Sequence, residues 1–150
     1  MIAFDTNILV YAEDSTEPSG KHKHAANLLT KAGKIDAVIP IQVLSEFVNV
    51  CRKKKIAGVE IITAKIDDFS SIFVTPHSSV ADIQDAAMLA EKYQMQFFDA
   101  LIVVITRRAG ATILISEDMQ DGLDIDGLKI VNPFAAANET LLADYFGSAL

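Results

Sequence analysis

Four acidic side chains lie where apolar sequence gives way to polar sequence, and these are the residues best suited to do chemistry. Asp5 directly follows the apolar start of the chain, and Asp118 lies just beyond the apolar run 111–115. Asp99 interrupts a stretch of aromatic and aliphatic residues, and Glu46 stands among Val, Leu and Phe. Burying a carboxylate alone is costly, whereas a carboxylate that coordinates a metal is tolerated. Four such oxygen ligands predict a converging site for Mg²⁺ or Mn²⁺.

The elements that would position these acids indicate an α/β fold. Short β-like runs alternate with helical segments along the chain. The expected strands are Ile2–Phe4, Ala37–Ile39, Ser71–Val74, Thr112–Ile115 and Leu128–Val131. This alternation predicts a largely parallel sheet covered by helices. Ligand sites in such sheets lie outside the carboxyl ends of the strands. Asp5 and Asp118 each follow a strand, so we expect both at that edge.

The clearest helix runs from Pro40 to about Lys54, because proline suits a first helical turn and the apolar residues recur with helical spacing. The predicted buried face comprises Val43, Leu44, Phe47, Val48, Val50 and Cys51. Glu46 lies on the narrow polar stripe opposite, where a merely solvated glutamate is the ordinary alternative to a ligand.

Two further helices are predicted, at 81–93 and 97–110. The first should turn Ile83, Ala86, Ala87, Leu89, Ala90 and Tyr93 inward. In the second, Ala100 to Ile105 fit a buried strand as well, but a buried helix is preferred, since Gly110 suits a left-handed stop. It places Asp99 in a first turn, where capping is an alternative to a site role. The tail 138–146 is a short helix with Leu141, Leu142, Tyr145 and Phe146 on one face, expected to pack on its own domain.

Length and composition predict a single domain over residues 1–150, with one packed core. The lone cysteine, Cys51, excludes an intramolecular disulfide and fits a reducing compartment. No apolar run reaches the roughly 18 residues that span a bilayer, and Asp5 interrupts any signal peptide, so a cytoplasmic location without a membrane partner is expected. The net charge of −7 argues against bulk attraction to nucleic acid, although basic residues cluster at 21–24, 52–55 and 107–108.

The acidic residues and their neighbours occur in the order and spacing of a known nuclease family. The matching motifs are Phe4-Asp5-Thr6-Asn7-Ile8-Leu9-Val10-Tyr11, Leu44-Ser45-Glu46-Phe47, Phe98-Asp99-Ala100-Leu101-Ile102, Ser116-Glu117-Asp118-Met119-Gln120-Asp121 and 127–134. Together they resemble the PIN domain, and the closing segment resembles VapC-type toxins. The resemblance covers essentially the whole chain and implies a PIN-like fold with four to five strands.

The resemblance carries over residue by residue. It implies that Asp5, Glu46, Asp99 and Asp118 are the catalytic and metal-binding acids. Asp121 is a candidate fifth ligand, with a turn role as the alternative. Thr6, Asn7 and Ser116 are expected to support the site. The implied activity is an endoribonuclease that depends on Mg²⁺ or Mn²⁺ and leaves a 5′-phosphate and a 3′-hydroxyl.

The resemblance also implies partners: an RNA substrate, a cognate antitoxin and a second copy of the chain in a homodimer. A housekeeping RNA-processing nuclease and a non-catalytic PIN-like module that binds RNA or protein are the alternatives. An aspartate-nucleophile phosphatase fits less well, because its motif requires a second Asp at the position of Asn7. A receiver domain requires a pair of acids near the start of the chain and a lysine after a late strand, and neither feature is evident.

Overall fold

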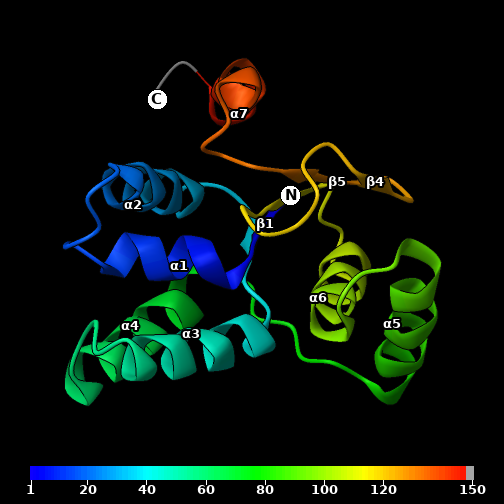
Figure 1. Ribbon diagram of the computed structural model, residues 1–150, viewed down its shortest axis with the longest axis horizontal. Coiled ribbons are helices and arrows are strands. Elements are labelled where there is room, and N and C mark those ends of the chain that lie inside the picture. Colours follow the sequence, from blue (N-terminus) through cyan, green and yellow to red (C-terminus); the bar gives the residue numbers. More distant parts are fainter. Residues whose placement is uncertain (148–150) are drawn as a thin grey trace.

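The computed structural model describes residues 1–147 as helices arranged around a five-stranded, mostly parallel sheet (Figure 1). The strands are β1 (Ile2–Phe4), β2 (Ala37–Val38), β3 (Ile113–Ile115), β4 (Asp124–Ile125) and β5 (Leu128–Val131). Their order is β2-β1-β3-β5-β4, and β4 alone pairs antiparallel. The α/β prediction of a parallel sheet with four to five strands is therefore confirmed.

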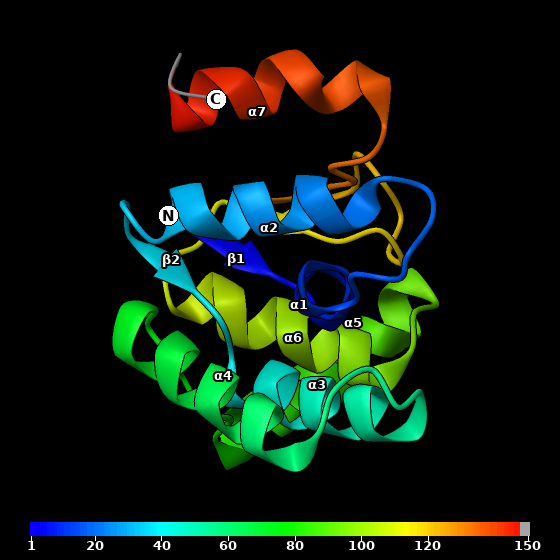
Figure 2. The same ribbon diagram turned by 90° about the vertical axis from the view of Figure 1, so that its left-hand side faces the viewer.

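The helices are α1 (Thr6–Glu13), α2 (Lys21–Ala32), α3 (Ile41–Lys53), α4 (Val59–Ile72), α5 (Val80–Tyr93), α6 (Phe97–Arg108), the short 3₁₀ turn η1 (Ala136–Asn138) and α7 (Glu139–Phe146). In Figure 1, α5 and α6 lie as a pair on one side of the molecule, while α1 packs with α2 and α3 on the other. Figure 2 shows α7 lying along the outside of α2. Within residues 1–147, no helix is long and apolar enough to cross a membrane.

The predicted helices are present. Pro40 precedes α3, and its buried positions are Val43, Leu44, Phe47 and Cys51. The segment 97–108 is helical as preferred, and Gly110 has a φ of +94° after it. Ala100–Thr106 are buried, so α6 runs through the centre of the fold, where an apolar helix belongs. In the tail, Leu142 is buried and the other three predicted residues pack against the core.

Two predictions about local structure are wrong: the strand at 71–74 and the inward position of Ile83 and Ala87. Residues 71–72 end α4 instead of starting a strand, and Val74 makes only an isolated bridge with Val38. On α5, Ile83 and Ala87 face outward, because the inward face is formed by Asp82, Ala86 and Leu89. Asp82 is buried because it closes a capping box with Ser79 and pairs with Arg108 of α6. The buried Asp82 carboxylate, paired with the exposed Arg108, thus takes the inward position that the apolar pattern predicted for Ile83.

The sheet has a topological switch point between β1 and β3. The chain leaves β1 toward β2 on one side, and later returns to β3 on the other side of β1. The carboxyl ends of these neighbouring parallel strands carry Asp5 and Ser116 directly after Phe4 and Ile115, residues that pair across the sheet. Parallel α/β sheets bind ligands at such a point.

Candidate active site

All four predicted acids line one pocket at the switch point. The pocket has a volume of about 330 Å³. Its walls come from α1, α3, the start of α6 and the loop after β3, and comprise Asp5, Thr6, Asn7, Val10, Tyr11, Asp14, Glu46, Val50, Lys54, Asp99 and Asp118. Residues separated by more than a hundred positions in the sequence therefore meet at a single acidic cavity.

Asp5 is the buried centre of this pocket, a residue that is only 4% exposed. It is the N-cap of α1: one carboxylate oxygen accepts a hydrogen bond from the Thr6 N–H at 2.7 Å. The other oxygen accepts from the Ser116 hydroxyl at 2.7 Å and from the Asn7 amide at 3.1 Å. Burial raises the pKa of Asp5 to about 6, and the nearby Asp99 and Glu46 carboxylates add to the increase.

Glu46 projects from the polar stripe of α3 into the pocket. The Thr6 hydroxyl donates to Glu46 Oε2 at 2.7 Å, and the Gln42 amide donates to Oε1 at 2.9 Å. The same Gln42 amide also donates to the carbonyl of Phe98, the residue before Asp99. Gln42 therefore joins α3 to the start of α6 and fixes the orientation of the Glu46 carboxylate.

Asn7 bridges two of the acids. Its Nδ2 lies 3.1 Å from Asp5 Oδ2 and 3.2 Å from Asp118 Oδ2. Asp118 itself is exposed at the pocket rim. A neutral amide that donates to two carboxylates offsets part of their mutual repulsion without adding charge.

Asp99 lies in the first turn of α6, and Gln96 is the N-cap of that helix. Among residues 1–147, the Asp99 carboxylate accepts no hydrogen bond, so it caps no backbone N–H there. Burial raises its pKa, as do the charges of Glu46 and Asp118. The helix N-terminus favours a carboxylate here through the backbone dipole, but the side chain is directed at the acidic pocket and not at its own helix.

Asp121 lies elsewhere. Its carboxylate accepts hydrogen bonds from the Asn132 N–H at 2.8 Å and from the Asn138 side-chain amide at 2.9 Å. It ties the loop after β3 to the connection that leads into α7, so we do not retain it among the proposed ligands.

Sequence reasoning did not identify Tyr11 and Asp14 as site components. Lys54 follows the last residue of α3 and belongs to the basic cluster 52–55 that the sequence singled out, and it lines the pocket beside the acids. For Tyr11 the signal is its position one helical turn after Asn7.

The donor set fits a hard divalent cation in type. The pocket offers carboxylate oxygens, the ligands that Mg²⁺ and Mn²⁺ prefer. The pKa values of Asp5 and Asp99 are raised there mainly by burial and further by the neighbouring carboxylates. Within residues 1–147, no three Asp, Glu, His or Cys side chains form a metal-binding group as they stand. Glu46 and Asp118 are held by neutral donors, which a bound cation would have to displace or share.

The chain belongs to the PIN domain family, whose family model matches residues 2–120. Three solved structures share its fold. A toxin–antitoxin complex from Klebsiella pneumoniae is 20% identical, with a TM-score of 0.65, 89% of this chain and 98% of the other being covered. VapC20 of Mycobacterium tuberculosis, described as a sarcin–ricin loop cleaving toxin, is 18% identical (TM-score 0.64, coverage 79% and 92%). VapBC2 of Rickettsia felis, bound to promoter DNA, is 23% identical (TM-score 0.61, coverage 88% and 98%). No curated protein sequence is significantly similar to the chain.

Proposed function

We propose that this PIN-domain protein is a Mg²⁺- or Mn²⁺-dependent endoribonuclease and acts in the cytoplasm as the toxin of a toxin–antitoxin pair. The observation that carries the proposal is the pocket at the switch point, where carboxylates from four separate elements meet. A set of repelling acids with raised pKa values costs stability, and a function that requires them accounts for that cost.

Asp5, Asp99 and Asp118 are the proposed metal ligands, and Glu46 either joins them or orients the attacking water. A divalent cation bound there would activate water and stabilise the negative charge of phosphodiester cleavage. Thr6 and Gln42 hold both Glu46 oxygens, so this carboxylate presents a fixed orientation. Ser116 and the Thr6 N–H keep Asp5 in place while it remains an anion at neutral pH.

Cleavage of purified RNA tests the activity directly. The purified protein should cut total RNA with millimolar Mn²⁺ or Mg²⁺ and should stop when EDTA is added. The new ends should carry a 5′-phosphate, so that an RNA ligase joins them without prior phosphorylation. Cleavage that persists in EDTA, or RNA that stays intact under all metal conditions, would contradict the proposal and favour a non-catalytic binding module.

The toxin assignment rests on the named neighbours, two of which contain both toxin and antitoxin. A small DNA-binding antitoxin encoded immediately upstream, which copurifies with this chain and inhibits it, is the expected finding. The absence of such a partner would instead favour a housekeeping RNA-processing nuclease with the same active site.

Lys54 is predicted to bind an RNA phosphate beside the acids, because it is the one basic side chain among residues 1–147 that lines the pocket. Lys54→Met should weaken RNA binding and reduce the salt slope of log K by about 0.7, the value for one phosphate contact on a single strand. Changing the exposed neighbours Arg52 and Lys53 together to Ala should act in the same direction. Lys34→Met, an exposed lysine outside this pocket, is the control. Equal salt slopes for Lys54→Met and the control would return the 52–55 cluster to ordinary solvated surface.

A homodimer is predicted at micromolar concentration without antitoxin. Large apolar side chains are exposed on α4, on α5 and on the segment between them, and each is a candidate for the contact between two copies. They are Val59, Ile61, Ile72, Val74, Val80, Ile83 and Met88. Light scattering should give twice the chain mass of 16.3 kDa. A single-chain mass over the whole micromolar range would contradict the dimer.

A further inference from the structure

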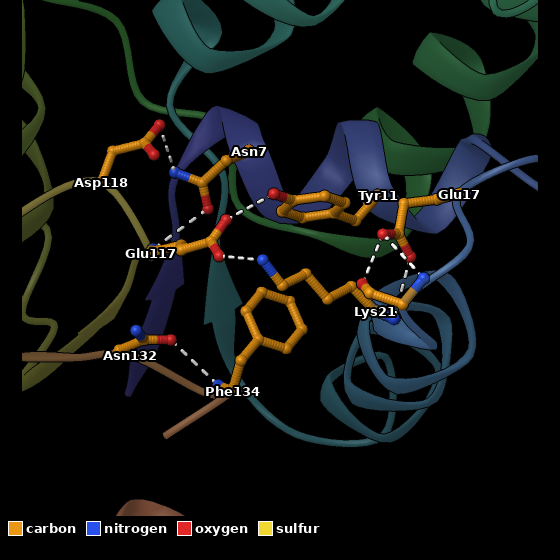
Figure 3. A network of polar contacts seen from close by, with 9 residues as sticks. Asn7, Tyr11, Glu17, Lys21, Glu117, Asp118, Asn132 and Phe134 are labelled. Atoms are coloured by element: carbon orange, nitrogen blue, oxygen red, sulfur yellow. Dashed lines mark hydrogen bonds and ion pairs between the residues drawn. The ribbon is translucent and has the colours of Figure 1, made fainter.

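Glu117 stands between two site residues in the sequence, but its side chain leaves the pocket and points to α1 and α2. Figure 3 shows its carboxylate between the Tyr11 hydroxyl and the Lys21 ammonium group. Tyr11 donates a hydrogen bond to Glu117 Oε2 at 2.5 Å, and Lys21 pairs with Oε1. The side chain of Glu117 is 20% exposed, so this contact is largely shielded from water.

The main chain of Glu117 faces the opposite way, toward the acids. Its N–H donates to Asn7 Oδ1 at 3.2 Å. This contact determines which way round the Asn7 amide lies, because Oδ1 faces a donor and Nδ2 faces the acceptors on Asp5 and Asp118. An inverted Asn7 amide would point its oxygen at two carboxylates. Glu117 therefore links its ion pair with Lys21, outside the pocket, to the orientation of Asn7 between Asp5 and Asp118.

Lys21 is itself held in place by aromatic rings. Its ammonium nitrogen lies 5.2 Å from the centre of the Tyr11 ring and 5.3 Å from that of Phe134, within the range of cation–π attraction. The two rings meet edge to face at 5.3 Å. Hydrogen bonding to Glu117 raises the pKa of both Lys21 and Tyr11, so the lysine stays charged and the phenol stays protonated at neutral pH.

Glu117 consequently differs from the four pocket acids in its electrostatic role. Its charge is compensated by Lys21, and it adds little to the repulsion around Asp5. A carboxylate held on two sides is suited to fixing the backbone of residues 116–118, which carries the Ser116 hydroxyl and Asp118.

We propose that Glu117 is a positioning residue of the active site: Tyr11 and Lys21 fix its side chain, and its N–H then sets Asn7 and the spacing of Asp5 and Asp118. This inference rests on the proposed metal-dependent function. Residues behind metal ligands change metal affinity or activity by about 10- to 100-fold when they are lost. A purely structural contact would instead lower stability without changing the affinity of the folded protein for metal.

The test compares Glu117→Ala and Glu117→Gln with the unaltered chain, using calorimetric Mn²⁺ titration and cleavage kinetics. Glu117→Ala should weaken Mn²⁺ binding about tenfold and lower kcat by a similar factor. KM for RNA should change less than about twofold, because the substrate contacts remain. Glu117→Gln can accept a hydrogen bond from Lys21 through its oxygen and donate one to the Tyr11 oxygen through its NH₂ group, so it should recover most of both losses.

Arg108→Met is the matched control. Arg108 pairs with the buried Asp82 and joins the C-terminal end of α6 to the start of α5, outside the acidic pocket. This variant should lose stability but keep the metal affinity and the kcat of the unaltered chain. Two results would overturn the inference: unchanged Mn²⁺ affinity in Glu117→Ala, or an equal loss of affinity in Arg108→Met.

The two metal-dependent claims can fail separately. If the unaltered chain binds Mn²⁺ but cuts no RNA, the ribonuclease proposal fails, and the affinity of Glu117→Ala still decides the positioning role. If the unaltered chain binds no Mn²⁺, both claims are overturned.

Discussion

Asp99→Asn should abolish RNA cleavage and at the same time make the metal-free protein more stable by about 1 kcal/mol. The substitution keeps the shape and removes one of the charges that crowd the pocket. Burial and two acidic neighbours raise the pKa of Asp99, so the carboxylate is held there at a cost. Asp99 accepts no hydrogen bond within residues 1–147, and therefore little is lost when its charge is removed.

Asp5→Asn should also abolish cleavage, but its gain in stability should be smaller. Asp5 accepts hydrogen bonds on both oxygens, and an asparagine would place an NH₂ group against the donors Ser116 and Asn7. The raised pKa of Asp5 corresponds to about 3 kcal/mol of relief at neutral pH, but two donors left facing an NH₂ group cost about 1–3 kcal/mol each and offset most of it. This difference between two acids of one pocket follows from the contacts and not from the sequence.

Melting curves in EDTA and in millimolar Mn²⁺, beside a cleavage assay on total RNA, measure both effects. Mn²⁺ should raise the melting temperature of the unaltered chain by binding only the folded state, and most of this increase should vanish in Asp99→Asn. Asp85→Asn, which removes an exposed acid of α5, controls for net charge. If Asp99 served only as a helix-end residue, Asn would replace it well and activity would survive. A variant that still cuts RNA and still gains stability from Mn²⁺ would end the assignment.

The sequence was sufficient for the fold class and for the elements with strong periodicity. The helix after Pro40 and the buried helix 97–108 follow from apolar spacing and end signals alone. The strand predicted at 71–74 was wrong because a short run of β-branched and aromatic residues occurs at the end of a helix as well as in a strand. The hairpin between β4 and β5 was missed although Asp126-Gly127, both with positive φ, is a typical turn signal.

The four acids of the candidate site could be predicted from the sequence, but the contacts that hold them in place could not. Acids that follow strands or open helices in an α/β fold are brought together by topology, so their order along the chain was informative. Glu117 is held by a residue about a hundred positions away in the sequence, and Asp121 by one about ten positions away. These contacts arise from side-chain packing between separate segments, so no local sequence pattern predicts them. Asp121 and Asp118 are three residues apart, yet one holds a loop and the other faces the pocket.

The metal-free protein should lose stability as the pH rises from about 4 to about 6, and Asp5 should be the main cause. Its pKa is about 6 in the folded protein, against an ordinary value of 3.8. Between these values the folded state holds a proton that the unfolded state has lost. The free energy of unfolding therefore falls with rising pH, by about 1.4 kcal/mol per pH unit for this group. Ionised Asp5 therefore lowers the free energy of unfolding by a total on the order of 3 kcal/mol. This loss is complete above pH 6 and absent below pH 3.8.

Other acids titrate in the same range, so the contribution of Asp5 must be taken as a difference. The pKa of Asp99 is raised and adds to the trend, whereas that of Asp82 is lowered by its hydrogen bonds and by Arg108 and opposes it. Urea unfolding of the unaltered chain and of Asp5→Asn in EDTA, from pH 4 to pH 7, isolates the one group. The altered hydrogen bonds of Asn change the free energy of unfolding by the same amount at every pH. They therefore do not affect the comparison, which uses only how the difference between the two proteins changes with pH.

Metal binding should show the opposite pH dependence in the same window. A protonated Asp5 cannot serve as a ligand, so the apparent Mn²⁺ affinity should fall about tenfold per unit below pH 6. The metal-free chain should thus be most stable where it binds metal worst. Parallel stability curves for the unaltered chain and Asp5→Asn would contradict the raised pKa of Asp5. Mn²⁺ affinity that stays constant from pH 7 to pH 5 would remove Asp5 from the ligand set, since a buried carboxylate with this pKa must lose its proton before it can bind a cation.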